Sequence, residues 1–467
     1  MKRALALRLS ISSIVLACAF TGGIAAQQEA RRDPPGNPAD QVSALIDKGN
    51  ALQKEGKCDE AVALYRQALT ARPNSVPALY SLGWCYNELK RYADAIGPLQ
   101  NAIRLKADYA TAHAELAHSY RHLSRLEEAI SEYKEAARLD AGNATTFYNL
   151  GWTYSEAQRF SEAVPALREA IRIEPANSKA HSELGYAYRK LQRLDEAIVE
   201  YNEAIRNNSS LASAYMGLGD VYYYDKKEYP KCVEPYQEAL RLEPNNAAVN
   251  YRLGWALNEM ENYAGAVLPL QAALRLTPND ASAHKELGYA YRQLKRFNES
   301  VTEYREAIRL KPDFALAYKE MGDLYFLSMS NCAEAITAYN NALRLKQDYP
   351  GAYYGLGWCF NDQNRSAEAV SPLQQAIRLK PDYAEAYNEL GYAYGQTKQN
   401  NQSMEAYLQA IRLKPDYALA HYNLGVAYIN QGNRSAALSE YEKLRTLDPT
   451  RAQKLNGMLN AGETGHH

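Results

Sequence analysis

This 467-residue sequence lacks an excess of charge of either sign. It contains 53 Lys and Arg residues against 54 Asp and Glu residues, for a formal net charge of −1. A protein that neutralises a phosphate backbone needs a basic surplus, so nucleic acid is not expected as the main partner. Hydrophobic residues still make up 46% of the chain, which excludes wholesale disorder.

The sequence also lacks the motifs of common catalytic sites. No phosphate-binding loop, nucleophile elbow or metalloprotease helix motif is present. We therefore predict that the protein is not an enzyme and has no catalytic residues, no cofactor and no metal. His118 and His122 have a spacing that can hold zinc, but no third ligand of evident role lies nearby. Four other histidines share one position of the repeat described below and are interpreted as packing residues: His113, His181, His284 and His421.

Long apolar runs are scarce as well. The run over residues 9–20 has 12 residues, fewer than the ~20 that a membrane span needs. It follows three basic residues and precedes a small-residue segment that ends at Ala26, a pattern typical of a secretory signal over residues 1–26. We expect an exported protein, periplasmic or secreted. One alternative is an uncleaved amphipathic anchor. Another is an outer-membrane lipoprotein with a lipid on Cys18, the only membrane attachment we expect.

Residues 27–41 contain three prolines and a glycine but no packing pattern, which predicts a stiff, polar linker.

The rest of the chain repeats with a period of about 34 residues. A small residue returns at this spacing in twelve places: Gly49, Gly83, Ala117, Gly151, Gly185, Gly219, Gly254, Gly288, Gly322, Gly357, Gly391 and Gly425. In residues 76–109, apolar side chains form two successive stripes at helical spacing, and small residues stand where two antiparallel helices must touch. A proline often closes the unit, where the helix cannot continue. One such hairpin cannot bury both stripes, so stability requires stacked neighbours.

This pattern resembles the tetratricopeptide repeat family, with twelve repeats over residues 42–451. The resemblance implies an all-α fold, a right-handed solenoid superhelix of antiparallel helix pairs. Residues 452–467 are then expected to form a capping helix and a disordered tail. Near 225–230 and 328–331 one extra residue is expected to lengthen the turn between the two helices of a pair.

A longer period of 103 residues is superimposed on the short one. Gly-Trp recurs at 151–152, 254–255 and 357–358, and Gly-Tyr at 185–186, 288–289 and 391–392. A recent duplication without functional meaning would account for this pattern. The alternative is a binding surface that recurs in every third unit.

All four tryptophans occupy one position of the repeat. At about 100° per residue, Trp84 projects roughly 160° from the centre of its helix's core stripe, so these side chains are not expected in the core. In the family that the sequence resembles, this face lines a concave groove that binds extended peptides. We predict an aromatic groove with alternating basic and acidic bands, unless the rings stack along the solenoid and only rigidify it. The predicted groove residues are Tyr80, Trp84, Arg121, Tyr148, Trp152, Tyr186, Arg189, Asp220, Tyr251, Trp255, Tyr289, Arg292, Asp323, Tyr354, Trp358 and Tyr392.

The cysteines of the repeat region suggest two disulfides. Cys58 and Cys85 are 27 residues apart, as are Cys332 and Cys359, at equivalent positions of consecutive units. Export permits oxidation, so both pairs are predicted to be bonded. Cys232 occupies a core position and is predicted to be a buried free thiol.

The predicted function is that of an exported scaffold. Its groove would bind an extended protein or peptide, or the scaffold would assemble a cell-envelope complex. The alternative is a component that binds or exports polysaccharide in the periplasm, which the aromatic series and the 103-residue period would suit.

Overall fold

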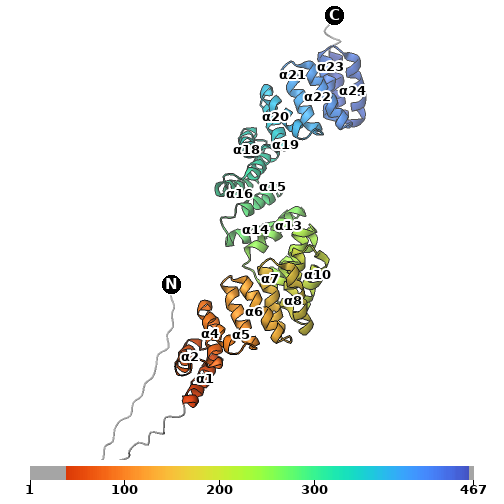
Figure 1. The fold of residues 1–467 in the computed structure, drawn as a ribbon. Helices are drawn as coiled ribbons and strands as arrows, with labels where there is room; N and C mark the ends of the chain where they lie inside the picture. Colours follow the sequence, from red (N-terminus) through yellow and green to blue (C-terminus); the bar gives the residue numbers. More distant parts are fainter. Residues whose placement is uncertain (1–37, 462–467) are drawn as a thin grey trace, which may run out of the picture. The chain divides into compact units, whose positions relative to one another are not determined.

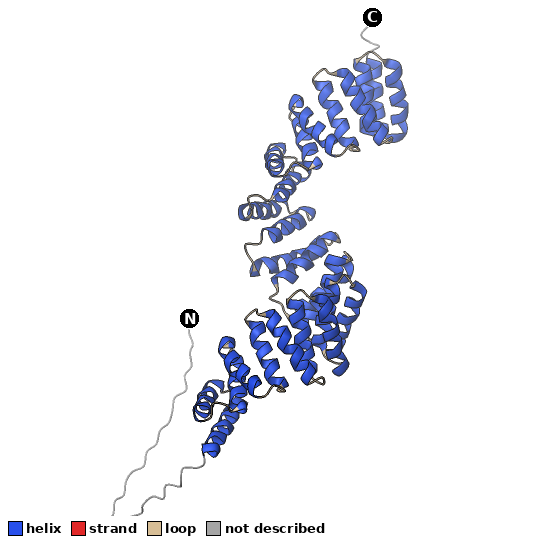
Figure 2. Cartoon of the chain, viewed as in Figure 1, coloured by secondary structure: helices blue, strands red, loops and turns tan. Residues whose placement is uncertain are grey.

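The computed structural model of the protein describes residues 38–461. The predicted signal segment, Cys18 and the tail from residue 462 lie outside this part. The described residues form 25 α-helices and two short π-helical segments, and no strand occurs among them (Figure 2). The chain divides after Leu139 into two compact units.

The first unit contains three helix pairs, which are coloured red to orange in Figure 1. Its helices are α1 (Pro38–Lys54), α2 (Cys58–Ala71), α3 (Val76–Glu88), α4 (Tyr92–Leu105), α5 (Ala110–His122) and α6 (Leu126–Leu139).

The second unit contains nine pairs and one further helix over the residues that the structure describes. Its helices are α7 (Ala144–Glu156), α8 (Phe160–Ile173), α9 (Ser178–Lys190), α10 (Leu194–Asn207), α11 (Ala212–Asp220), α12 (Tyr229–Leu242), α13 (Ala247–Glu259), α14 (Tyr263–Leu276), α15 (Ala281–Gln293), α16 (Phe297–Leu310), α17 (Ala315–Asp323), α18 (Cys332–Leu345), α19 (Pro350–Asp362), α20 (Ser366–Leu379), α21 (Ala384–Gln396), α22 (Asn400–Leu413), α23 (Ala418–Asn430), α24 (Arg434–Leu447) and α25 (Pro449–Ala461). The π-helical segments are η1 (Val221–Asp225) and η2 (Leu324–Ser328).

Close contact inside each pair follows from the small residues of the repeat. Gly254 of α13 lies against the fully buried Leu270 of α14, and a Cβ atom added to the glycine would come within 2.5 Å of the leucine Cγ. Within each unit, the second helix of a pair also packs on the first helix of the next pair. The predicted all-α solenoid of stacked, antiparallel helix pairs is confirmed.

Two boundaries of the predicted repeats differ from the structure. Helix α1 begins at Pro38, so the last four residues of the predicted linker, 38–41, are helical. Proline suits the first helical position because the amide hydrogen it lacks would have no partner within the helix. At the other end, α25 begins at Pro449, before the predicted boundary at residue 452, and buries Leu455 and Leu459.

Each of the two longer units contains one extra residue, which was predicted to lengthen the turn between its two helices. The structure shows a different arrangement. The extra residues widen the end of the first helix into the π-helical segments η1 and η2. A single insertion into a helix is commonly absorbed as such a wider turn.

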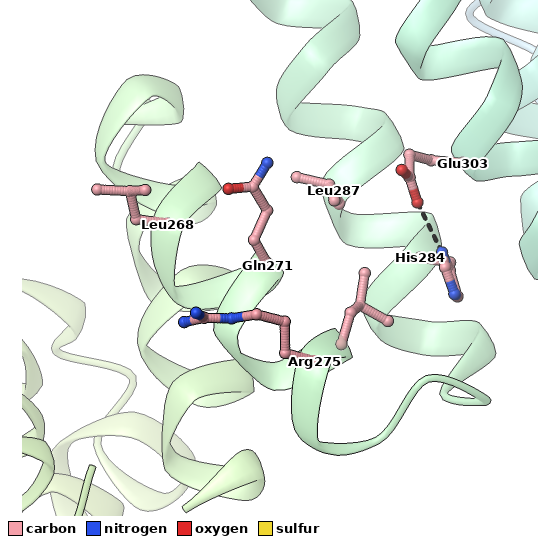
Figure 3. Close-up of a pocket in the computed structure, with 7 residues that line it drawn as sticks. Leu268, Gln271, Arg275, His284, Leu287 and Glu303 are labelled. Carbon is pink, nitrogen blue, oxygen red and sulfur yellow. Dashed lines mark hydrogen bonds and ion pairs between the residues drawn. The ribbon is translucent and has the colours of Figure 1, made fainter. Parts of the chain in front are cut away.

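The four histidines of the shared repeat position act as polar braces. His181 Nδ1 lies 2.6 Å from Glu200 Oε2 on the second helix of the same pair, and Nε2 lies 3.0 Å from the Pro175 carbonyl oxygen. His284 makes the same two contacts with Glu303 and Pro278, and Figure 3 shows its contact with Glu303. His113 and His421 repeat the arrangement with Glu132 and Glu440.

The backbone carbonyl and the glutamate beside His181, His284 and His421 are both acceptors, so the fully bonded form of each of these rings carries a proton on each nitrogen. The hydrogen bond with Glu200 raises the pKa of His181, and the bond with Glu440 does the same for His421. Burial opposes the rise at His284, but Glu303 and the Pro278 carbonyl outweigh it and the pKa is still raised.

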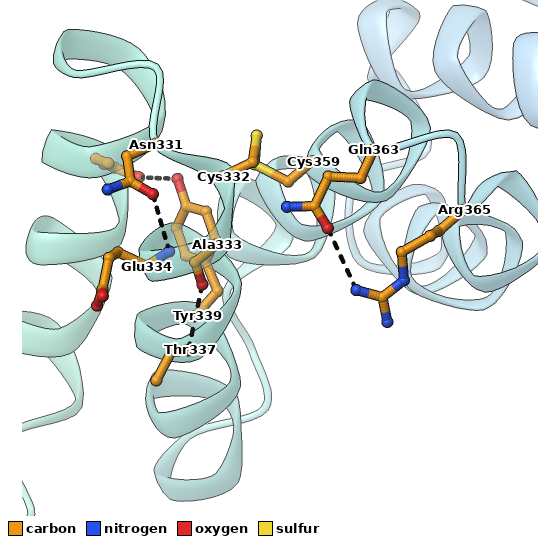
Figure 4. Close-up of a disulfide and its surroundings, with 10 residues drawn as sticks. Asn331, Cys332, Ala333, Glu334, Thr337, Tyr339, Cys359, Gln363 and Arg365 are labelled. Carbon is orange, nitrogen blue, oxygen red and sulfur yellow. Dashed lines mark hydrogen bonds between the residues drawn. A yellow bond between two sulfur atoms is a disulfide. The ribbon is translucent and has the colours of Figure 1, made fainter.

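One of the two predicted disulfides is formed. Cys332 at the start of α18 is bonded to Cys359 of α19, with their Cα atoms 5.1 Å apart (Figure 4). The bond joins two consecutive helix pairs, as the spacing predicted. Cys232 is a buried free thiol, which confirms that prediction, and its Sγ lies 3.1 Å from the Tyr229 carbonyl oxygen.

The predicted Cys58–Cys85 disulfide is wrong. Both residues are buried free thiols. Burial raises the pKa of Cys85, and a hydrogen bond with Cys58 raises it further. Because the thiolate is the reactive form, this environment disfavours oxidation.

The histidine braces predict that stability decreases as the pH rises. A raised folded-state pKa adds stability that is complete below the unfolded value of about 6.5 and is lost as the pH rises through the folded value. The thermal midpoint should therefore fall between pH 6 and pH 9. Asparagine is a suitable replacement that does not titrate, because Asn250 occupies the same repeat position and its side chain donates to the Pro244 carbonyl oxygen at 3.3 Å. Replacing His181, His284 and His421 with Asn should flatten the profile. An unchanged slope in this variant would contradict the assignment.

Candidate functional site

The predicted groove residues lie on the first helices of the pairs. The four tryptophans and the predicted tyrosines are half-buried, so none belongs to the core and none is fully exposed. In the second unit, Trp152, Trp255 and Trp358 lie on α7, α13 and α19, and Tyr186, Tyr289 and Tyr392 lie on the first helices that follow. We call these six residues the aromatic face.

Rings of the aromatic face contact the preceding helix pair. The Trp255 ring lies edge-on to Tyr223 and Tyr229, with centroid distances of 5.1 and 5.2 Å. The Trp358 ring lies 4.8 Å from Phe326. These contacts agree with the alternative interpretation that the rings rigidify the stack. They use only part of each side chain, because the tryptophans keep exposed surface.

The first unit holds three of the predicted groove residues. The Tyr80 ring lies 5.0 Å from that of Tyr109, and Trp84 is half-buried against the core. Arg121, in contrast, is only 8% exposed. The prediction that Arg121 lines an open groove is therefore wrong, because Arg121 is buried.

The predicted basic and acidic bands of the second unit neutralise each other. Arg189 lies between two carboxylates, with Nη1 3.0 Å from Asp220 Oδ2 and Nε 2.5 Å from Asp225 Oδ2. Arg252 Nη1 contacts the other Asp220 oxygen at 2.9 Å, and the Tyr236 hydroxyl donates to the same oxygen at 2.9 Å. This network joins three consecutive pairs, so its charges stabilise the stack and leave little for a ligand.

The network recurs 103 residues later with two changes, because Ser328 stands in the place of Asp225 and Gly355 in the place of Arg252. Arg292 Nη1 lies 3.1 Å from Glu320 Oε2 and 3.7 Å from Asp323 Oδ2, and the Tyr339 hydroxyl donates to Asp323 Oδ1 at 2.9 Å. Lys319 supplies the second cation, 2.7 Å from Asp323. Burial lowers the pKa of Lys319, but Glu320 and Asp323 outweigh this effect and the pKa is raised. Arg252 and Lys319 were missed because neither recurs at its position in the other copy.

A second repeated contact joins three of the four tryptophan-bearing helices to the next pair; α7 has Ser155 in place of the asparagine. Asn361, three residues after Trp358, donates from Nδ2 to the carbonyl oxygen of Glu389 at 3.0 Å and to its Oε2 at 3.1 Å. Asn258 with Glu286, and Asn87 with Glu115, make the same contacts. Burial raises the pKa of each of these glutamates, which the asparagine bonds only partly offset. The recurrence of Asn and Glu 28 residues apart was a sequence signal for this pair.

Two cavities open at the C-terminal end of the aromatic face. Trp358, Glu389 and Tyr392 line one of about 230 Å³. Tyr392 also borders a second of about 370 Å³ that reaches Tyr407 and Met458. A third cavity of about 510 Å³ lies among α14, α15 and α16, beside Leu268 and Arg275, and includes none of the predicted residues (Figure 3). The predicted site thus coincides with hollow surface at Trp358 and Tyr392.

The last two candidate features are a metal site and a helix that could cross a membrane. The His118 and His122 rings pack on each other and on Tyr92, and burial lowers the pKa of His118 to about 4. Residues 38–461 contain no group of three or more His, Cys, Asp or Glu side chains placed to hold a metal ion. In the same part of the chain, no helix has the length and apolar composition that a membrane crossing requires.

Family comparisons agree with the repeat geometry. Models described as tetratricopeptide repeat match residues 46–110, 108–176, 224–281, 324–384 and 418–451, and a model described as TPR repeat matches 185–223, 288–328 and 396–432. The chain belongs to the tetratricopeptide repeat family. Members of this family are scaffolds, typically non-catalytic, that bind protein or peptide partners.

Individual relatives are more distant. A search of curated proteins found no match. Among solved structures, the chain is similar to MamA, with 27% identity over 35% of this chain and 96% of that chain, at a TM-score of 0.34. It is also similar to PilF of Pseudomonas aeruginosa, with 24% identity over 44% and 94% and a TM-score of 0.39. YrrB, described as a TPR protein with an unusual peptide-binding site, shows 22% identity over 47% and 95%, at 0.32. At these TM-scores the likenesses carry no information on the function of this chain.

The half-buried position of Trp255 predicts an intermediate cost of truncation. Trp255→Ala should lower the free energy of unfolding by about 1–3 kcal/mol, more than a surface change but less than loss of a core aromatic. Leu268→Ala is the matched control, because Leu268 is 74% exposed on the adjoining helix α14 and should change stability little. Chemical denaturation measures both. A cost for Trp255→Ala as small as that of the control would show that its contacts with Tyr223 and Tyr229 contribute nothing.

Proposed function

We propose that this chain is an exported scaffold whose aromatic face binds an extended segment of a partner protein in the cell envelope. One observation carries the proposal: Trp358 and Tyr392, at equivalent places on consecutive first helices, line the same open cavity of about 230 Å³. Exposed aromatic rings beside a pocket are typical anchors of protein interfaces. Export is supported by the pattern of residues 1–26, which lie outside the described part.

The polar groups around the cavity favour a peptide as the ligand. Asn361 and Asn423 offer amides, and Asp362 and Glu389 offer carboxyl groups, within one helical turn or two repeats of Trp358. A peptide presents both backbone amides and charged side chains that such groups recognise. A polysaccharide is the alternative, because the Trp–Asn–Glu arrangement recurs after 103 residues, at Trp255, and could match a repeating ligand.

Binding to arrays tests the proposal. Full-length protein should bind a subset of immobilised ten-residue peptides and show no preference on a glycan array. Trp358→Ala and Tyr392→Ala should each weaken binding to those peptides about tenfold or more, as truncation of interface anchors does. Leu268→Ala, with its exposed side chain away from the aromatic face, should bind as the parent does. Binding to glycans that is lost in Trp358→Ala would favour the polysaccharide. Unchanged binding in both aromatic variants would show that the aromatic face is not the binding site.

A further inference from the structure

The cavity between Trp358 and Tyr392 is acidic. Asp362 and Glu389 are among its lining residues, and no lysine, arginine or histidine is. Asp362 is exposed at the end of α19, and no ion pair to it occurs within residues 38–461. This contrasts with Asp220 and Asp323 of the same unit, which are paired with arginine or lysine.

Glu389 is half-buried at this cavity and has no cation beside it among the described residues. Its Oε2 accepts from Asn361 Nδ2 at 3.1 Å, and its Oε1 accepts from Asn388 Nδ2 at 3.2 Å. Neither amide carries a charge that could balance a carboxylate. A carboxylate that is partly removed from water is costly unless a positive charge accompanies it, so this site favours a cation from outside the chain.

A second observation adds to the negative character of the cavity. Asn361, which lines it, is only 5% exposed, and its Oδ1 has no hydrogen-bond partner among the described residues. In the first unit, the equivalent oxygen of Asn87 accepts from Ser119 Oγ at 2.6 Å. Ala393 stands in the place of that serine and offers no donor. The unmet carbonyl dipole therefore lies beside the two carboxyl groups.

The protein itself shows which group completes this arrangement. Glu286 stands 103 residues before Glu389 and makes the same contacts, with Asn258 in the place of Asn361. There, the Lys285 ammonium pairs with Glu286 Oε1. Asn388 occupies the place of Lys285 in the later copy. One copy thus supplies its own ammonium group, and the other leaves the position to an uncharged amide.

We infer that the cavity bounded by Trp358, Asp362 and Glu389 is a subsite for a basic side chain, lysine or arginine, of a bound peptide. This inference rests on the proposed function. The cation would lie against the Trp358 ring, where aromatic faces attract positive charge, and between the two carboxyl groups. Leu419, at the edge of the same cavity, would contact the apolar stem of the side chain.

Short peptides test the subsite directly. The probes are acetyl-Gly-Gly-X-Gly-Gly-amide, with X as lysine or norleucine, which has a similar apolar stem but no charge. The readout is the Trp358 indole ¹⁵N–H signal of the full chain, assigned with Trp358→Phe. The lysine peptide should shift this signal and bind at least about tenfold more tightly than the norleucine peptide, with an advantage that shrinks as salt is added.

Charge variants locate the effect. Asp362→Asn and Glu389→Gln should each remove most of the preference for lysine. Glu368→Gln removes a charge of the same sign from the exposed Arg365–Glu368 pair outside the cavity and should not change the preference. Asn388→Lys, which copies Lys285, should fill the position and abolish binding of the lysine peptide; because it also removes the acceptor of Asn423 Nδ2, the thermal midpoint is measured to confirm that the variant is folded. If Glu389→Gln does not fold, Asp362→Asn at the exposed rim still gives the answer.

The outcomes separate this inference from the proposed function. Equal binding of the lysine and norleucine peptides, or an unchanged preference in Asp362→Asn, would overturn the basic subsite even if Trp358 remains essential on the peptide array. Lysine-specific shifts at Trp358 in a protein that binds no peptide on the array would support the subsite and reject the proposed function.

Discussion

The structure depends on burial between neighbouring helix pairs. Each pair carries apolar stripes that its own two helices cannot cover, so each stays folded only against the pairs beside it. Inside a pair, the small residues of the repeat bring the two helices close together, as the packing of Gly254 against Leu270 shows. Each histidine brace links a first helix to the turn that precedes it, as His181 does with the Pro175 carbonyl oxygen. The Cys332–Cys359 bond links two consecutive pairs.

The aromatic face is a product of the same stacking. Trp255 and Trp358 each use part of the ring to contact the preceding pair and leave the rest at the surface. The cavity at Trp358 is lined by residues of α19, α21 and α23, the first helices of three successive pairs, so it depends on the stacking of those pairs. Stabilisation and the proposed recognition therefore share residues here, and a change that loosens the stack also alters the cavity.

The repeat pattern in the sequence was sufficient to predict the helix pairs, the off-core position of the tryptophans and the Cys332–Cys359 bond. It could not predict partners within the surface. Helical spacing places Arg189 and Asp220 on one face, but does not say whether they neutralise each other or a ligand. Arg252 and Lys319 occur in one copy each, and Cys58 and Cys85 match the bonded pair in position yet remain thiols. Such differences depend on side-chain contacts that a period does not encode.

Amide hydrogen exchange on a chain that ends at Asp448 tests the dependence on neighbours most directly. This truncation removes α25, whose Leu455 and Leu459 cover the last pair together with Leu444. If each pair is held by its neighbours, exchange should accelerate strongly in α23 and α24, weakly in α21 and α22, and not at all in α7 to α10. Equal acceleration along the whole second unit would show that it unfolds as a single cooperative block and would contradict this account.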